Sequence, residues 1–492
     1  MNWLSHVNYA KDRALSALNA LKIVSNKKWG ISRATLLKFY KSFVLPIFDY
    51  GCIVYASAKE RNLSKLNTVH HSGIRIATGA LRTSPIPSLY VESGIPSLKL
   101  RRDKLTMNYI AKVGGSPFNP VHNVLFNQVL PAEKFTVNKP KPLCLRYGEM
   151  TAFVDRVRAS HILPYSRFIP PWFDNSFLPD FDFQLSSYKK ADTPPLVYQQ
   201  KFLQAISSNY STSVLCYTDG SKSATSTSCA FSIDGILSAN MLNPINSIFS
   251  AELIAILLCL RSIKNHPAMR FLLVSDSMGS LSAIANPYFS CPIISQIYSA
   301  WCDLKTVGKY VKLMWCPSHC GIRGNEAVDQ AAKDPLSIVP RDREEDIVNE
   351  AIRNLSTPLK LCTPHDFKPW IAKLCRTQWQ RSWDNILINK LKKIKPIIEE
   401  WPTSQRSNRM EEVVLTRLRI GHTRLTHKHI FTREPQPLCQ CGVILTIHHI
   451  LVCITHAHIR ASLPSPPSLA DDVEGIDSLF LYLKTLNLFN LI

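Results

Sequence analysis

Four acidic residues in this chain have the types and the spacing for metal-dependent chemistry. Asp219, Glu252, Asp276 and Asp329 are 33, 24 and 53 residues apart, and each adjoins an apolar stretch. Like charges repel one another, so four converging carboxylates require cations. Oxygen ligands favour Mg²⁺ or Mn²⁺ over Zn²⁺. Two such ions about 4 Å apart can stabilise both the attacking and the leaving oxygen of a phosphodiester displacement.

Each candidate also has an ordinary structural interpretation when it is taken alone. Asp219-Gly220 would form a turn, Glu252 would complement a helix dipole, and Asp276 would cap the following helix. His319 precedes the last acid and can shuttle a proton or help product leave, although alone it is a plain loop histidine. The complete set, in this order, favours the catalytic interpretation.

Alternating strand and helix patterns predict the elements that must position these acids. Ser250 is the expected N-cap of the helix that carries Glu252, and Asp234-Gly235 predicts a tight hairpin turn. The predicted strands span residues 213–217, 230–233, 236–242, 271–275 and 311–315. The predicted helices span residues 251–263, 277–285, 293–307 and 325–333. Three hairpin strands followed by strand–helix alternation predict a mixed five-stranded sheet with helices packed on it, an α/β fold.

The residues around the acids form a sequence signature. It consists of Tyr217-Thr218-Asp219-Gly220-Ser221, Ser250-Ala251-Glu252-Leu253, Val274-Ser275-Asp276-Ser277, and Cys316-Pro317-Ser318-His319 leading into Gly324-Asn325-Glu326 and Asp329. The stretch 215–333 therefore resembles a type 1 ribonuclease H domain. Cys229 is a departure, because relatives often carry glycine there, and it bears on packing rather than on metal ligation.

The resemblance implies a reaction and a role for each acid. It implies that Asp219 bridges two Mg²⁺ ions, for which Mn²⁺ can substitute, and that Glu252, Asp276 and Asp329 complete the two sites. The implied reaction is endonucleolytic hydrolysis of the RNA strand of an RNA–DNA hybrid, leaving 3′-hydroxyl and 5′-phosphate ends. The RNA 2′-hydroxyl and the groove shape of the hybrid would give discrimination.

Two other functions stay open. One is a nucleic-acid-binding remnant without turnover, which the loss of any of the four acids would favour, and none is missing. The other is a different nuclease of the same superfold, such as an integrase-like enzyme. The signature from Pro317 to Asp329 favours ribonuclease H over this second alternative.

Charge is unevenly distributed along the chain. The chain has 492 residues, a length that suggests about three units, and it carries a net charge of +22. Residues 1–130 hold 18 basic and 5 acidic residues, whereas residues 211–335 hold 9 and 8. This distribution predicts that a nucleic acid is bound mainly by residues outside the catalytic domain. A solubilising surface is the alternative explanation.

The sequence gives no sign of export or of membrane insertion. The N-terminus lacks the sustained apolar core of a secretory signal, and the longest apolar run, 253–260, is too short to span a bilayer. Fourteen scattered cysteines indicate reduced thiols. We expect an intracellular protein of the nucleus or cytoplasm with no membrane partner, whereas the oligomeric state is not predicted.

Residues 1–125 are predicted to be helical. The order of Trp29-Gly30, Asp49-Tyr50-Gly51, Ile76-Ala77-Thr78-Gly79-Ala80 and Glu92-Ser93-Gly94 is similar to the thumb-like region of non-LTR retrotransposon (jockey-like) polyproteins. A plain helical bundle is the alternative. Because no Tyr/Phe-x-Asp-Asp motif or palm is found, we do not expect DNA polymerisation. The expectation is a truncated copy, or the C-terminal half of a longer polyprotein.

The remaining segments are a linker and a second helical region. Residues 126–210 are proline-rich and predict a linker with short ordered patches such as Trp172-Phe173. Residues 336–492 are predicted to be helical, with an amphipathic tail at 479–491 that packs back on the body. Within it, the basic stretch 417–427 would either contact phosphates or form a solvated helix end.

A group of cysteines and histidines lies near the C-terminus. Cys439, Cys441, His449 and Cys453 have the types for a tetrahedral Zn²⁺ site, with His448 as the alternative imidazole ligand. A similar cluster lies at this place in related elements. The other interpretation is reduced thiols with surface histidines.

Overall fold

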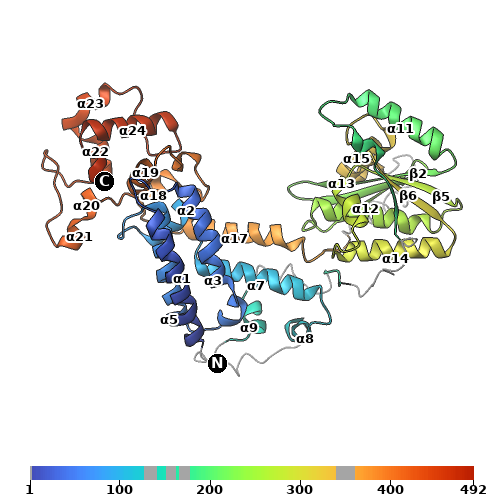
Figure 1. Cartoon of the computed structure of the whole chain (residues 1–492), viewed down its shortest axis with the longest axis horizontal. Helices are drawn as coiled ribbons and strands as arrows, with labels where there is room; N and C mark the ends of the chain where they lie inside the picture. Colours follow the sequence, from blue (N-terminus) through green and yellow to red (C-terminus); the bar gives the residue numbers. More distant parts are fainter. Residues whose placement is uncertain (1–2, 127–140, 151–161, 166–177, 339–358, 360) are drawn as a thin grey trace. The chain divides into compact units, whose positions relative to one another are not determined.

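A computed structural model describes residues 3–126, 141–150, 162–165, 178–338, 359 and 361–492 of the chain. The chain forms two compact units (Figure 1). Unit 1 comprises Met1–Met107, Pro131–Arg146 and Ala372–Ile492, and unit 2 comprises Asn108–Leu130 and Tyr147–Ile371. No helix among the described residues combines the length and the apolar character needed to cross a membrane.

Unit 2 is built on a mixed six-stranded sheet with the order β1-β6-β5-β2-β3-β4. The strands are β1 Asp180–Asp182, β2 Val214–Lys222, β3 Thr227–Ile233, β4 Ile236–Leu242, β5 Arg270–Ser275 and β6 Tyr310–Trp315. Strands β2, β3 and β4 are antiparallel, whereas β5 pairs in parallel with β2 and β6, and β1 in parallel with β6. Positive φ angles at Asp234 and Gly235 confirm the tight turn between β3 and β4.

The five predicted strands are all present, and the structure adds a sixth. Strand β1 lies outside the stretch predicted to be catalytic and pairs Phe181 with Leu313 at the edge of the sheet. Only three residues long, it cannot show an alternating pattern, and Pro179 precedes it. Sequence periodicity therefore could not distinguish it from a loop.

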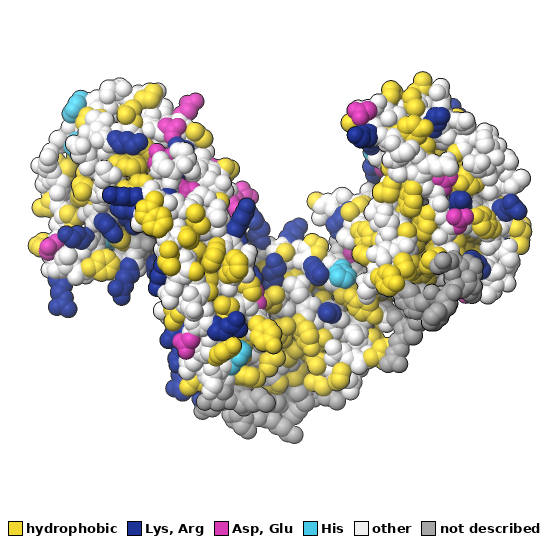
Figure 2. Space-filling view, viewed as in Figure 1, with side chains coloured by type: hydrophobic (Ala, Val, Ile, Leu, Met, Phe, Trp, Pro, Cys, Tyr) yellow, Lys and Arg dark blue, Asp and Glu magenta, His cyan; other side chains and the backbone are white. Residues whose placement is uncertain are grey.

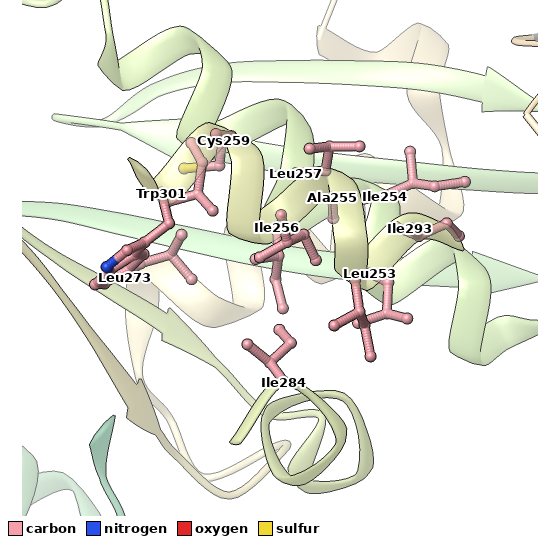
Figure 3. Packing of buried hydrophobic residues seen from close by; sticks show 14 of the residues in the cluster. Leu253, Ile254, Ala255, Ile256, Leu257, Cys259, Leu273, Ile284, Ile293 and Trp301 are labelled. Carbon is pink, nitrogen blue, oxygen red and sulfur yellow. The ribbon is translucent and has the colours of Figure 1, made fainter. Parts of the chain in front are cut away.

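Helices cover both faces of this sheet. Helices α12 Ile248–Ile263, α13 Met278–Ala285 and α14 Pro292–Thr306 share one apolar core, and α11 Pro195–Asn209 and α15 Arg323–Lys333 contribute to the core on the other face. Figure 3 shows side chains of α12 packed around Leu273 of β5, Ile284 of α13 and Trp301 of α14. Because α12 is enclosed by the sheet and two helices, it is apolar around most of its circumference.

The span predicted as a proline-rich linker holds regular elements. Its described residues include α9 Leu143–Gly148, β1, a short 3₁₀ turn at Gln184–Ser187 and the fifteen-residue α11. Helix α11 starts at Pro195, and proline is tolerated at the first position of a helix because its missing N–H has no helical partner there. The predicted patch Trp172-Phe173 lies outside the described residues.

Unit 1 is helical and joins the two ends of the chain in one core. Its helices are α1 Leu4–Val24, α2 Arg33–Phe39, α3 Leu45–Asp49, α4 Cys52–Tyr55, α5 Glu60–Thr78, α6 Ile86–Ser93, parts of α7 Leu98–Gly114 and α17 Phe367–Asp384, α18 Lys390–Ile394, α19 Arg409–Ile420, α20 Arg424–His427, α21 His429–Thr432, α22 Ile447–Val452, α23 Ala457–Ala461 and α24 Val473–Thr485. Trp383, Leu391 and Ile420 pack in the cluster formed by the N-terminal helices. Unit 2 also has the short helix α8 Pro120–Phe126.

Buried polar contacts strengthen this union of the two ends. Ser32 caps α2, and the next residue, Arg33, is almost fully buried. The Arg33 guanidinium donates to Glu92 Oε1 at 2.7 Å and to Thr416 Oγ1 at 3.1 Å, and its backbone amide donates to Glu412 Oε2 at 2.7 Å. The predicted C-terminal tail likewise packs back, because Leu479 and Leu483 of α24 share a core with Leu418 of α19.

Candidate active site

Asp219 lies inside strand β2, paired with Ala230 of β3, and not in the turn expected of Asp219-Gly220. The reason for the glycine is a close approach rather than a turn. A Cβ atom on Gly220 would lie 2.7 Å from the backbone nitrogen of Glu252, so only glycine lets α12 pack directly on β2. This contact brings the second acid beside the first.

The start of α12 is held by side chains that are distant in sequence. The N-cap is Ser247, whose hydroxyl accepts from the Ser250 amide, so the predicted cap at Ser250 is wrong by one turn. Asp366 Oδ1 accepts hydrogen bonds from the Ser247 amide at 2.9 Å and from both serine hydroxyls at 2.7 Å. Asp366 is 1% exposed, and this buried network fixes the position of Glu252 along the sheet.

Asp276 follows the end of β5 and is oriented by two neighbours. The Trp315 indole donates to the Asp276 backbone carbonyl at 3.0 Å, and Asn325 Nδ2 donates to the carboxylate at 3.3 Å. The role of Asn325 was missed in the sequence, although its position four residues before Asp329 on α15 places both on one face of that helix.

Three of the four predicted acids converge tightly. One carboxylate oxygen from each of Asp219, Glu252 and Asp276 lies within 4.8 Å of the others. Burial, followed by the charges of Asp276 and Asp329, raises the pKa of Asp219 to about 7. Burial and the charge of Asp219 raise the pKa of Glu252 to about 9. Protein groups alone therefore hold these carboxylates poorly in their charged form.

The donor set fits a hard divalent cation. Asp219 Oδ2 and Glu252 Oε2 are buried without any hydrogen-bond partner, a costly arrangement that an ion would satisfy. The ligands are carboxylate oxygens, which Mg²⁺ and Mn²⁺ prefer.

Asp329 and His319 flank this group instead of joining it. Asp329 lies on α15 outside the 4.8 Å cluster, and its Oδ2 accepts from Lys333 Nζ at 2.6 Å. Its charge still raises the pKa of Asp219, Glu252 and Asp276. His319 is exposed in the loop before α15, and its positive charge would lower the pKa of Asp276.

The C-terminal cysteines form a second group, in unit 1. The Cys439 and Cys453 sulfurs are 3.7 Å apart, Cys453 and Cys441 are 3.8 Å apart, and Cys441 Sγ is 3.2 Å from His449 Nε2. A tetrahedral ion with bonds of about 2.3 Å places its sulfur ligands about 3.8 Å apart. The structure brings His449, not His448, into this group.

Local structure shapes this second group. The chain reverses direction between Leu438 and Ile444, which form an antiparallel bridge, and Gly442 takes a φ of +81° in this turn. Thr446 caps α22, which carries His449, and Cys453 follows the end of that helix. Hydrogen bonding, first from the Thr455 side chain, lowers the pKa of Cys453 to about 6, which favours the thiolate that a metal requires.

The two arginines of the basic stretch 417–427 that lie on α19 are neither phosphate ligands nor solvated. Arg417 donates to the carbonyls of Gly79 at 2.8 Å and Ile492 at 2.7 Å. Arg419 is 1% exposed and donates to the Leu469 and Ala470 carbonyls, at 2.9 and 2.8 Å. Both satisfy backbone acceptors inside unit 1, so both predictions for this stretch are wrong at these two positions.

Comparison with known families identifies the fold around the acids. Residues 211–337 match the family model described as RNase H. No curated protein matches the chain. The chain therefore contains an RNase H domain with a mixed sheet and helices, flanked by helical regions, as its resemblance predicted.

Proposed function

We propose that this chain hydrolyses the RNA strand of RNA–DNA hybrids and that Asp219, Glu252, Asp276 and Asp329 bind two Mg²⁺ ions for this reaction. An RNase H domain indicates a hydrolase that acts on such hybrids. The observation that carries the residue assignment is the pair of buried, unpartnered oxygens on Asp219 and Glu252 beside Asp276. When bound, the ions would supply charge stabilisation to the attacking and leaving oxygens.

The side chains divide the remaining work. Asp219 is central, because its buried carboxylate lies within 4.8 Å of those of Glu252 and Asp276, and the charges of Asp276 and Asp329 both act on it. Asn325 and Trp315 keep Asp276 in one orientation. His319, exposed in the loop before α15, can assist the departure of product.

A cleavage assay on a labelled hybrid tests this function. Wild-type protein should cleave the RNA strand in the presence of Mg²⁺ and not after chelation. Asp219→Asn keeps the shape and removes a charge, so turnover should fall at least ~100-fold. Asp234→Asn, in the β3–β4 turn, is the matched control and should retain activity. Near-normal turnover in Asp219→Asn would remove Asp219 from the mechanism.

Nucleic-acid binding by unit 1 is the second part of the proposal. Unit 1 holds 37 basic and 16 acidic residues, a net charge of +21, whereas unit 2 holds 21 and 20. Figure 2 shows Lys and Arg side chains spread over the visible face of unit 1. Such an excess supports binding to a polyanion in a sequence-independent way.

One cluster of basic side chains in unit 1 has no acidic partner among the described residues. Lys27, Lys28 and Arg424 form no ion pair among the described residues, and Lys27 has a lowered pKa because of burial and then of Arg424, Arg417 and Lys28. Like charges held together without an acid favour an anion between them. Trp29, 67% exposed beside Lys28, adds a face on which a base can stack.

The alternative function is a nucleic-acid-binding remnant without turnover, which the charge of unit 1 alone would support. The cleavage assay separates the two, since a remnant would bind the hybrid and leave it intact. We also propose that the chain derives from a non-LTR retrotransposon, on the order of short motifs in residues 1–115. Finding a reverse-transcriptase palm encoded directly upstream would test this origin.

A structural Zn²⁺ at Cys439, Cys441, His449 and Cys453 completes the proposal. The spacing of the three sulfurs supports it. The ion would cross-link the 438–444 turn to α22, which together have little apolar core of their own.

A further inference from the structure

The loop that carries His319 accepts hydrogen bonds from two side chains that lie outside residues 211–337, which match the RNase H family. Lys190 Nζ donates to the Ser318 carbonyl at 3.1 Å and to the Ser318 hydroxyl at 3.0 Å. Gln199 Nε2 donates to the Gly321 carbonyl at 2.5 Å. The two contacts bracket His319, and both donors precede residue 211, where the RNase H match begins.

This loop needs external support to keep its shape. His319 has φ +55° and Gly321 has φ +75°, a left-handed region that a histidine adopts only with compensation from its surroundings. Inside the domain, two side chains of the described residues contact the loop backbone: Glu326 Oε1 accepts from the Gly321 amide at 2.8 Å, and Cys320 Sγ, a weak donor, lies 3.5 Å from the Ser318 carbonyl. The packing against Gln199 is tight, because a Cβ on Gly321 would lie 2.0 Å from Gln199 Nε2.

The helix that carries Gln199 is itself firmly anchored. Tyr198, next to Gln199 on α11, is 1% exposed and its hydroxyl donates to the Tyr188 carbonyl at 2.8 Å. Phe202, one turn later, is buried in the core that also contains Tyr217 and Ile322. The start of α11, which carries Gln199, is thus fixed to the core that contains Ile322, and the Tyr198–Tyr188 bond ties the chain just before Lys190 to the same helix.

We propose that segment 188–199 is a clamp that holds the His319 loop beside the acidic site, with Lys190 and Gln199 as positioning residues. The inference deepens the proposed ribonuclease function, on which its catalytic part rests. Without the clamp the loop would have to order at each turnover, which would lower kcat more than it changes KM. With the clamp, the loop that carries His319 is already ordered when the hybrid binds.

Two neighbouring residues give matched controls. Lys189, like Lys190, is exposed, and Gln200 follows Gln199 with an exposed side chain. Among the described residues, neither Lys189 nor Gln200 has a side-chain hydrogen bond or ion pair. Lys190→Gln and Gln199→Ala are the test variants, and Lys189→Gln and Gln200→Ala are the controls. Thermal melting shows that each full-length variant is folded.

Hydrogen exchange on the free protein tests the clamp without any need for activity. Amides of residues 318–322 should exchange roughly tenfold faster in both test variants and at the wild-type rate in both controls. With labelled hybrid and Mg²⁺, kcat should fall roughly fivefold in the test variants, KM should change less than twofold, and Lys190→Arg should recover most of the loss. Unchanged exchange would overturn the clamp, and faster exchange with unchanged kcat would overturn its catalytic role. If wild type does not cleave, the proposed function fails, and the exchange rates still decide the clamp.

Discussion

A methyl group placed on Gly220 would lie 2.7 Å from the backbone nitrogen of Glu252. Real side chains essentially never approach backbone so closely, so either strand β2 or helix α12 would have to move. The two acids of the site sit on these two elements, Asp219 directly before the glycine and Glu252 at the contact itself. Close packing at one backbone position therefore sets the separation of the carboxylates.

Gly220→Ala should damage both stability and catalysis. Overpacking of this kind costs about 1–3 kcal/mol, and the displacement of α12 would move Glu252 away from Asp219. Gly279→Ala is the matched control, because nothing lies within 4 Å of its added Cβ on α13. Thermal melting and hybrid cleavage should show losses in Gly220→Ala alone. Equal behaviour of the two variants would mean that the strand and helix can separate without consequence.

Local pattern was sufficient to predict most of the elements around the acids. Helix α12 and strands β4 and β5 were predicted within three residues of their observed ends, because apolar runs bounded by turn residues dominate there. Strand β2 runs five residues beyond its predicted end, since Asp219-Gly220 resembles a turn when seen alone. Gly220 is required by its contact with Glu252, which lies 32 residues later in the chain, and no local pattern contains such a contact.

The errors share this dependence on distant partners. Asp366 determines the start of α12 from 116 residues beyond Ser250. Arg417 has the sequence context of a phosphate ligand, yet its acceptor at Gly79 lies 338 residues earlier in the chain. Burial of a basic side chain depends on such acceptors, and single-sequence reasoning cannot place them.

Nucleic-acid affinity should depend on the cations of unit 1. Replacing Lys27, Lys28 and Arg424 with glutamine removes three charges, so the slope of log affinity against log salt should fall by about 3 for a duplex. Glutamine at Lys189, Arg261 and Lys264 of unit 2 removes as many charges and should leave the slope near its wild-type value. Binding of a labelled hybrid across a salt series measures both.

Point substitutions suit this experiment better than a deletion of residues 1–130. The N-terminal helices share their core with Trp383, Leu391 and Ile420, so removing them would expose the apolar face of the remaining helices. If the slope of log affinity against log salt is unchanged in the unit 1 variant, these three cations do not contact the nucleic acid and serve only to keep the protein soluble.

The stability of unit 1 should fall as the pH drops below 6.5. Burial lowers the pKa of His70 to about 3, while its ring contacts the Tyr40 hydroxyl at 2.6 Å and the Pro96 carbonyl at 3.1 Å. The unfolded chain takes up a proton near pH 6.5 and the folded chain does not. The neutral ring therefore contributes stability above pH 6.5, and about 2 kcal/mol of it is lost by pH 5.

A His70→Gln variant isolates this contribution. Thermal melts at pH 7, 6 and 5 should show a shallower loss of stability in His70→Gln than in wild type, whatever its stability at pH 7. His458→Gln, at an exposed position, should keep the wild-type slope. Parallel curves for all three proteins would place the acid sensitivity of unit 1 in other groups.

Zinc content tests the C-terminal cluster. Because three sulfurs and His449 Nε2 already stand at the spacing of a tetrahedral shell, protein purified without chelator should contain about one zinc per chain. Cys441→Ser and His449→Gln should each lose that zinc, while His448→Gln, which changes the adjacent and exposed imidazole, should retain it. Hybrid cleavage should survive all three substitutions, since the nuclease acids belong to unit 2.

Chelation should increase proteolysis after Pro437, because the turn at 438–444 depends on the ion for its attachment to α22. Zinc-free wild-type protein would identify these cysteines as reduced thiols, and zinc that persists in His449→Gln but leaves with His448→Gln would exchange the two histidines in the ligand set.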